Sequence, residues 1–174
     1  MNIRRAILSD AEGIAKVHVD SWISTYKNIV PDSFLDQLSY KQRASLWERN
    51  IAKEGNYVFI AISDDGEIVG FADCGKRDSN SVENSGDLTS IYLLQEHHGK
   101  GIGKLLMKQL FLQFKELGLH RVFVEVLEDN KTCYFYEYYG ANLHKSETIT
   151  IASAELKLLI YEWDNLNQVL NKFD

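Results

Sequence analysis

Residues 91–106 read IYLLQEHHGKGIGKLL, and this stretch carries the strongest structural signal in the chain. An apolar run ends at Leu94, glycines follow at alternate positions, and an amphipathic pattern then continues to Leu117. The pattern predicts a strand over 88–94, a tight glycine turn and a helix closed by Gly118. Glycine permits the backbone conformations that such a turn needs, and it lets a ligand approach the backbone closely.

The start of this helix suits a phosphate group, because a helix N-terminus offers unpaired N–H groups and a partial positive charge of about +0.5. Lys100 and Lys104 add positive charge nearby. A Walker loop is excluded, because His98 stands where its first glycine is needed and Leu105 stands where Ser or Thr should follow the lysine. A dinucleotide fingerprint is excluded as well, because the glycine spacing is one residue short.

Further strands and helices are predicted on both sides of this stretch in the sequence. Hydrophobic periodicity predicts strands over 3–7, 57–63, 68–74, 88–94, 121–127, 142–151 and 155–163. It predicts helices from Ser9 or Asp10 to Tyr26, over 102–117 and over 130–139, with two short helices or one bent helix over 34–51. This order predicts a mixed α/β (α+β) fold with a central sheet of about seven strands and helices on both faces.

Length and composition fit one globular domain over residues 1–174, with 45% hydrophobic and 25% charged residues. The net charge of −6 disfavours nucleic acid as a partner. The two cysteines, Cys74 and Cys133, form no CxxC pair, so neither a disulfide framework nor a zinc site is expected. The longest apolar run, 57–62, is too short to span a membrane, and the start lacks a signal-peptide pattern. We therefore expect a cytoplasmic protein with no membrane partner.

The chain resembles the GNAT superfamily of N-acetyltransferases in three places. Residues 91–106 are similar to its acetyl-CoA motif, whose Q/R-x-x-G-x-G/A loop binds the coenzyme A pyrophosphate. Asn130 and the run FYEYYG at 135–140 are similar to the family's second motif, and residues 18–31 look like those of some bacterial members. The resemblance covers nearly the whole chain. Three departures stand out: His98 replaces the usual Gln or Arg, the spacing from Asn130 to Tyr136 is one residue shorter than the commonest, and Ala141 replaces a Phe.

The resemblance implies an acetyl-CoA-dependent N-acetyltransferase acting by direct transfer in a ternary complex. No metal is expected, because the adjacent His97 and His98 have poor geometry for sharing an ion. The backbone of Ile91 and Leu93 should pair with the pantetheine amides like an added strand. By the same resemblance, acetyl-CoA should contact Ile91, Leu93, His98, Gly99, Lys100, Gly101, Ile102, Gly103, Lys104, Asn130 and Tyr136. Asn130 would also suit a helix N-cap.

Acetyl transfer to an amine requires a base for the amine and an acid for the leaving thiolate. Tyr136 matches the family's acid, although its neighbours also read as an ordinary aromatic helix. Glu125 interrupts an apolar strand and Asp87 opens the strand before the glycine loop, so both are candidate bases. Each also has a plain structural reading, Glu125 as a residue on a solvated face and Asp87 as a loop charge. A chain of water molecules is a further route for the proton.

The acceptor is expected to be a small cationic amine, such as a polyamine, an amino sugar or an amino acid. Trp22 and Tyr26 lie on the face of the first helix that walls the acceptor pocket in the family, although an aromatic stripe is usually core. Two alternatives stay open: an acetyltransferase acting on protein lysines or N-termini, and a non-catalytic acetyl-CoA-binding regulatory module. Strand edges within 142–163 make a homodimer possible.

Overall fold

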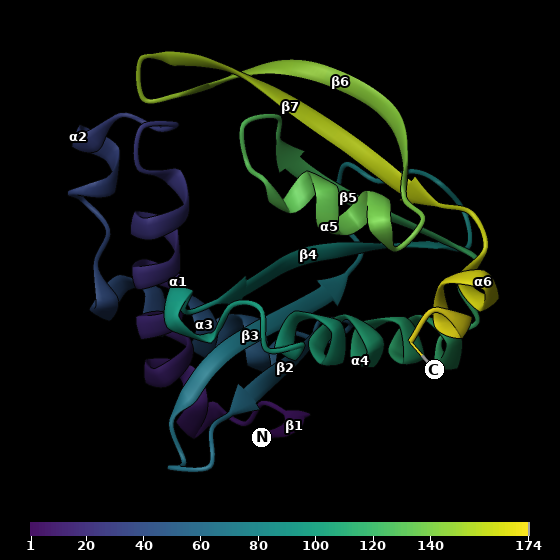
Figure 1. Cartoon of the computed structure of the whole chain (residues 1–174), viewed down its shortest axis with the longest axis horizontal. Coiled ribbons are helices and arrows are strands. Elements are labelled where there is room, and N and C mark those ends of the chain that lie inside the picture. The colour runs from purple at the N-terminus through teal and green to yellow at the C-terminus, as the bar shows by residue number, and fades with distance from the viewer. Residues whose placement is uncertain (174) are drawn as a thin grey trace.

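The computed structural model describes residues 1–173, and one seven-stranded sheet runs through them in the order β1-β2-β3-β4-β5-β7-β6 (Figure 1). The strands are β1 (Asn2–Arg5), β2 (Tyr57–Ile62), β3 (Ile68–Gly75), β4 (Ser85–Leu93), β5 (Arg121–Leu127), β6 (Asn142–Ile151) and β7 (Ala154–Trp163). Neighbouring strands are antiparallel except β4 and β5, which are parallel. The predicted mixed sheet is confirmed.

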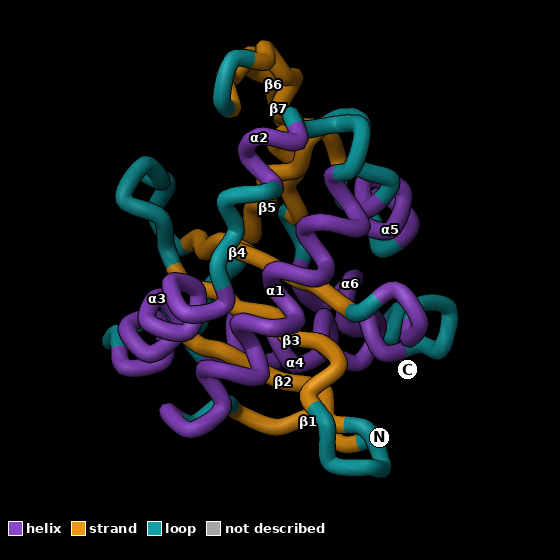
Figure 2. The backbone as a smooth tube through the Cα atoms, turned by 90° about the vertical axis from the view of Figure 1, so that its left-hand side faces the viewer, coloured by secondary structure: helices purple, strands orange, loops and turns teal. Residues whose placement is uncertain are grey.

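Helices cover both faces of this sheet, as predicted. They are α1 (Ala11–Tyr26), α2 (Asp32–Leu35), α3 (Tyr40–Ala52), α4 (Ile102–Glu116), α5 (Thr132–Tyr138) and α6 (Leu166–Asn171), with short 3-10 turns at Leu8–Asp10 and Gln95–His97. α1 and α3 pack on one face of β2 and β3, and α4 packs on the other. The hairpin of β6 and β7 rises beside α2 at the far end of the sheet (Figure 2).

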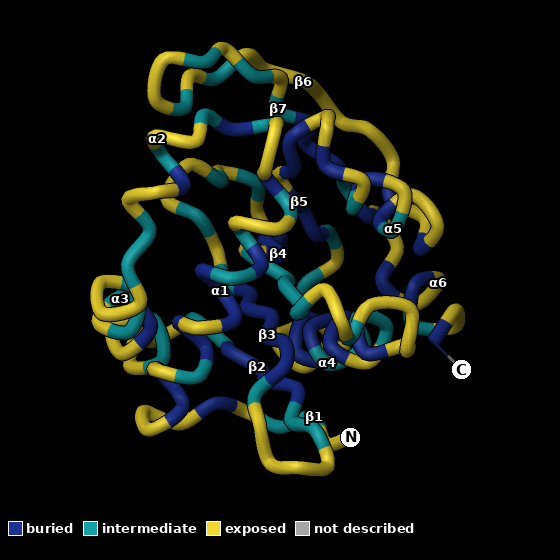
Figure 3. Tube along the Cα trace, turned by 60° about the vertical axis from the view of Figure 1, so that its left-hand side comes forward, coloured by how far each residue is buried: buried dark blue, intermediate teal, exposed yellow. Residues whose placement is uncertain are grey.

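The hydrophobic core has two halves, which lie on opposite faces of β3. Phe71 packs with Ile14 of α1 and Trp47 of α3, whereas its neighbour Ala72 belongs to the cluster that contains Leu106 and Leu110 of α4. Successive side chains of a strand point to opposite faces, so both faces of this strand are covered. By contrast, β6 is exposed along most of its length (Figure 3).

β4 and β5 separate along their length, and this opening positions the site. Their pairing covers only Ser85–Leu88 of β4 against Arg121–Val124 of β5. At the same level Thr89 forms a bulge against β3, because Asp73 pairs with Ser90 while the next residue of β3 pairs with Leu88. Beyond this point the two strands diverge toward their carboxyl ends (Figure 1). The edge of β4 that faces β5 is therefore unpaired from Thr89 onward.

Some boundaries differ from those predicted. β4 begins at Ser85, three residues before the predicted start at 88. Asp10 stands at the N-cap of α1, but its carboxylate binds Arg4 and accepts the Ile7 N–H instead of capping the helix. Helix α6 was not predicted, because six residues hold too few turns to show a helical period.

Candidate active site

The glycine turn forms an open helix start. Gly99 and Gly101 have φ of +73° and +78°, a backbone region that favours glycine. Gly101 is the N-cap of α4, and no side chain caps the N–H groups of the first turn. These groups and the helix dipole make the turn suitable for a phosphate.

A cavity of about 380 Å³ opens beside this turn, and we call it the glycine-loop cavity. Most of the residues predicted to bind acetyl-CoA line it: Ile91, Leu93, His98, Gly99, Gly101, Ile102, Gly103 and Lys104. Thr25, Tyr92, Thr132, Phe135 and Tyr139 complete the lining. The remaining predicted residues lie outside it. Lys100 is exposed, whereas Asn130 and Tyr136 are buried.

The unpaired edge of β4 borders the same cavity at Ile91 and Leu93. A strand edge of this kind can pair with an extended chain of amides. His98 fastens the turn to the strand, because its Nε2 lies 2.9 Å from the Leu93 carbonyl oxygen. The cavity thus fits a molecule that carries phosphates at one end and an extended amide arm at the other, as coenzyme A does.

A second cavity, of about 250 Å³, lies where β4 and β5 begin to separate. We call it the charged cavity. It is lined by Arg77, Ser79, Asn80, Ser81, Val82, Asp87, Phe123, Glu125, His144, Lys145, Glu147 and Ile160. Glu125 shares a face of β5 with Leu127, which packs with Tyr26 of α1, so the cavity opens on the α1 side of the sheet.

Arg77 lies between the two candidate bases. Its backbone N–H donates to Asp87 Oδ2 at 2.8 Å, and Asn80 Nδ2 donates to the same oxygen at 3.0 Å. Its guanidinium lies 3.5 Å from Asp87 Oδ1 and 3.8 Å from Glu125 Oε2. Asp87 therefore anchors the loop that follows β3, while Glu125 points into the cavity with about a third of its side chain exposed. Sequence reasoning missed Arg77, because a lone arginine in a polar loop gives no signal.

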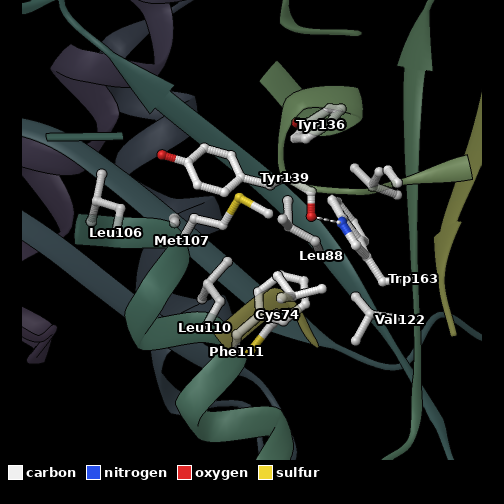
Figure 4. Packing of buried hydrophobic residues seen from close by; sticks show 14 of the residues in the cluster. Cys74, Leu88, Leu106, Met107, Leu110, Phe111, Val122, Tyr136, Tyr139 and Trp163 are labelled. Carbon is white, nitrogen blue, oxygen red and sulfur yellow. Dashed lines mark hydrogen bonds between the residues drawn. The ribbon is translucent and has the colours of Figure 1, made fainter. Parts of the chain in front are cut away.

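Tyr136 is a neutral phenol in the core. Its ring packs edge-on against Trp163 and Phe135, and it reaches the same core as Leu88 of β4 (Figure 4). Burial, and next the nearby Tyr26 hydroxyl, raise the pKa of Tyr136 above its ordinary value. The hydroxyl thus keeps its proton at neutral pH, as a general acid must.

Tyr26 belongs to a buried polar network rather than to a cavity wall. Its hydroxyl lies 3.1 Å from that of Tyr92 and accepts a hydrogen bond from Asn130 Nδ2 at 3.2 Å. Asn130 Oδ1 also accepts the Thr132 N–H at 3.0 Å, but the N-cap of α5 is Lys131, one residue later than expected. Trp22 packs against Tyr26 at a ring distance of 4.4 Å, and neither residue lines the two cavities. Their contact with substrate stays a prediction.

Two further titratable groups are buried on the face of the sheet that α1 covers. His18 accepts a hydrogen bond from Trp47 Nε1 at 3.0 Å, and burial lowers its pKa to about 4. Asp73, on β3, accepts a hydrogen bond from Ser90 beside the bulge. Burial raises the pKa of Asp73 to about 6. Sequence reasoning missed Asp73 because its burial depends on strands and loops that meet only in the fold.

Comparison with known proteins identifies the family of this chain. Residues 19–141 match the model of the family described as acetyltransferase (GNAT) family. The chain belongs to the GNAT family. It is therefore an N-acetyltransferase with acetyl-CoA as cosubstrate, and the predicted family and enzyme class are confirmed.

This GNAT chain is 34% identical over 167 residues to an uncharacterized N-acetyltransferase, YuaI, of Bacillus subtilis (strain 168), covering 96% of this chain and 95% of that one. A ribosomal protein bS18-alanine N-acetyltransferase of Haemophilus influenzae is 34% identical over 86 residues, covering 49% of this chain and 56% of that protein. Among solved structures, the PaiA N-acetyltransferase from Thermoplasma acidophilum in complex with coenzyme A superposes with a TM-score of 0.71 at 21% identity, covering 94% of this chain and 98% of that one.

Through residue 173, no helix combines the length and apolar character that crossing a membrane would require. The same residues contain no group of three His, Cys, Asp or Glu side chains placed to hold a metal ion.

Proposed function

We propose that this GNAT enzyme, as a single domain, transfers acetyl from acetyl-CoA directly to a small primary amine while both substrates are bound. One observation carries the proposal: the glycine-loop cavity and the charged cavity lie on either side of the point where β4 and β5 separate. A ligand with its phosphates at the start of α4 and its amide arm along Ile91 and Leu93 would bring its far end to this point. An amine in the charged cavity would meet it there.

In this proposal one residue acts as the base and another as the acid. Glu125 accepts one proton from the acceptor ammonium and passes it to solvent, which leaves the nitrogen lone pair free. Acetyl-CoA supplies an activated acetyl group, whose carbon forms a bond to nitrogen while its bond to sulfur breaks. Tyr136 donates its proton to the departing sulfur and recovers one from the acceptor nitrogen. The net products are an amide, the coenzyme A thiol and one released proton.

A small acceptor is favoured over a protein by the walls of the site. The tip of the β6–β7 hairpin, through Ile149 and Leu156, packs with Phe34 of α2. A protein segment would need an open groove between this hairpin and α2, and the contact fills part of that space. Glu125 and Asp87 give the cavity the negative charge that a cationic amine needs.

Thiol release dependent on acetyl-CoA tests the proposal across polyamines, amino sugars, free amino acids and lysine peptides. Turnover of small amines is expected. Binding of acetyl-CoA without turnover of any amine would instead support a regulatory module. The similarity to a ribosomal-protein-alanine acetyltransferase makes a protein N-terminus the second candidate, so the panel includes peptides that begin with alanine.

A further inference from the structure

The guanidinium of Arg77 has few partners for its position in the charged cavity. A guanidinium offers several N–H donors in a planar fork. Within residues 1–173, its one hydrogen bond runs from Nη2 to the Thr89 carbonyl oxygen at 3.4 Å, the long end of the range. Its Nη1 is buried and has no hydrogen-bond partner. A buried donor of this kind is unfavourable unless a ligand completes it.

The two carboxylates beside Arg77 do not complete it. Asp87 Oδ1 lies 3.5 Å from Nη1 and Glu125 Oε2 lies 3.8 Å from Nε, so both are ion pairs without a hydrogen bond. Asp87 is already held by the Arg77 backbone N–H and by Asn80. The guanidinium is therefore in place for another anion, and Glu125 stands within a few ångströms for a cation.

This pairing matches one chemical class of acceptor. A carboxylate fits the guanidinium fork through two parallel hydrogen bonds. An α-amino acid carries an ammonium and a carboxylate on one carbon, so a single molecule can meet Glu125 and Arg77 together. A polyamine offers only positive charges, and one of them would lie against Arg77.

The rest of the charged cavity suits a molecule of that size. Its volume of about 250 Å³ falls below the roughly 300–1,000 Å³ of pockets for drug-sized ligands. Val82, Phe123 and Ile160 supply apolar lining for a side chain. Of the other two basic residues in the lining, Lys145 donates a hydrogen bond to Glu147 at 2.6 Å, and His144 Nδ1 lies 3.6 Å from Glu162 Oε1, so Arg77 is the partner left for the carboxylate.

We propose that the acceptor amine carries a carboxylate, as an α-amino acid does, and that Arg77 binds this carboxylate and so determines specificity. The inference rests on the proposed function and narrows its substrate class. It predicts that free amino acids are better acceptors than polyamines, plain amines and protein N-termini. The first residue of a protein has no free α-carboxylate.

Matched substrate pairs test it: L-leucine with isoamylamine, L-phenylalanine with phenethylamine, and L-histidine with histamine. Each pair differs by the carboxylate. In the wild-type enzyme kcat/KM should favour the amino acid by about 100-fold. Arg77→Gln should lower this preference by about 100-fold, mainly through a higher KM for the amino acid, because the carboxylate loses its partner.

Two further variants keep the test independent of folding. Arg77→Lys keeps the charge and loses the fork, so its preference should fall by about 10-fold. Arg49→Gln removes an exposed arginine of α3 that does not line the cavity, and it should keep the wild-type preference. Acetyl-CoA binding and thermal melting report whether each variant is folded.

Several outcomes would overturn the inference while acetyl transfer stands. One is an equal loss for amino acids and amines in Arg77→Gln, which would make Arg77 only a loop anchor. Others are a wild-type preference for plain amines, for alanine peptides or for glucosamine phosphate. No turnover with any amine would overturn the proposed function, and this inference with it.

Discussion

The two cavities that flank the opening between β4 and β5 are built in opposite ways. The glycine-loop cavity comes mostly from one stretch, 91–104, and offers backbone groups with no carboxylate in its lining. The charged cavity gathers side chains from the loop after β3 and from four strands. The difference matches our proposal that backbone groups bind the cosubstrate and that side chains select the acceptor.

The largest expected effect concerns Tyr136, the proposed proton donor to the departing sulfur, which lines neither cavity. Tyr136→Phe should lower kcat by about 10²–10³-fold, because general acid catalysis contributes at this scale. Steady-state kinetics and acetyl-CoA titration would measure it, with binding expected to persist. Tyr134→Phe is the control, since Tyr134 is 71% exposed on the same helix. An unchanged kcat would remove Tyr136 from the chemistry.

The next effect tests whether acetyl-CoA binding in the glycine-loop cavity depends on the backbone conformation of the turn. Gly101→Val puts a branched side chain at φ of +78° in the turn, so it should raise the Kd for acetyl-CoA by about 100-fold. Gly66→Val is matched, because Gly66 has φ of +86° in a hairpin turn with open space around it. Calorimetric titration of both compares the same strain inside and outside the site. Equal affinities would contradict the assignment.

A smaller effect separates the two carboxylates of the charged cavity. Glu125→Gln should lower kcat/KM by about 10-fold at pH 7, and the loss should shrink toward pH 10 as the amine deprotonates without help. Asp87→Asn should chiefly lower the melting temperature, because Asp87 anchors the loop through Arg77 and Asn80. A pH–rate profile of each variant distinguishes them. The reverse pattern would make Asp87 the base.

The smallest effect concerns Asp73, which is buried beside the same opening. Its pKa of about 6 lies above the ordinary value of 3.8, so the folded state holds a proton that the unfolded state has released. Stability that is present below pH 4 is therefore lost as pH rises through 6.

Urea unfolding at pH 5 and pH 8 measures this contribution. Asp73→Asn should remove about 1–2 kcal/mol of the wild-type decline in unfolding free energy. The contribution of His18 runs the other way, being lost as pH falls from 6.5 through its pKa of about 4, and it cancels in the comparison. Asp65→Asn, in an exposed turn, controls for the change of charge. Equal slopes in wild type and Asp73→Asn would contradict the raised pKa.

Features that depend on neighbours along the chain could be predicted from the sequence. Alternation and helical period located the strands and the main helices, because side-chain direction repeats with the local backbone. The glycines at 99 and 101 predicted the phosphate turn, because few other residues accept their φ angles. Together these local signals predicted the sheet and a phosphate-binding turn, whereas acetyl-CoA as the ligand was predicted from the resemblance to the GNAT family.

Contacts between residues that are distant in the sequence could be seen only in the folded chain. Arg77 forms an ion pair with Glu125, which is 48 positions away in the sequence. Asp73 accepts a hydrogen bond from Ser90 on the neighbouring strand, beside a bulge. Tyr26 joins Asn130 across more than a hundred residues. Such pairs leave no period or spacing in the sequence, because strand order and register bring them together. The charged cavity therefore depends on the fold, whereas most residues that line the glycine-loop cavity are close together in the sequence.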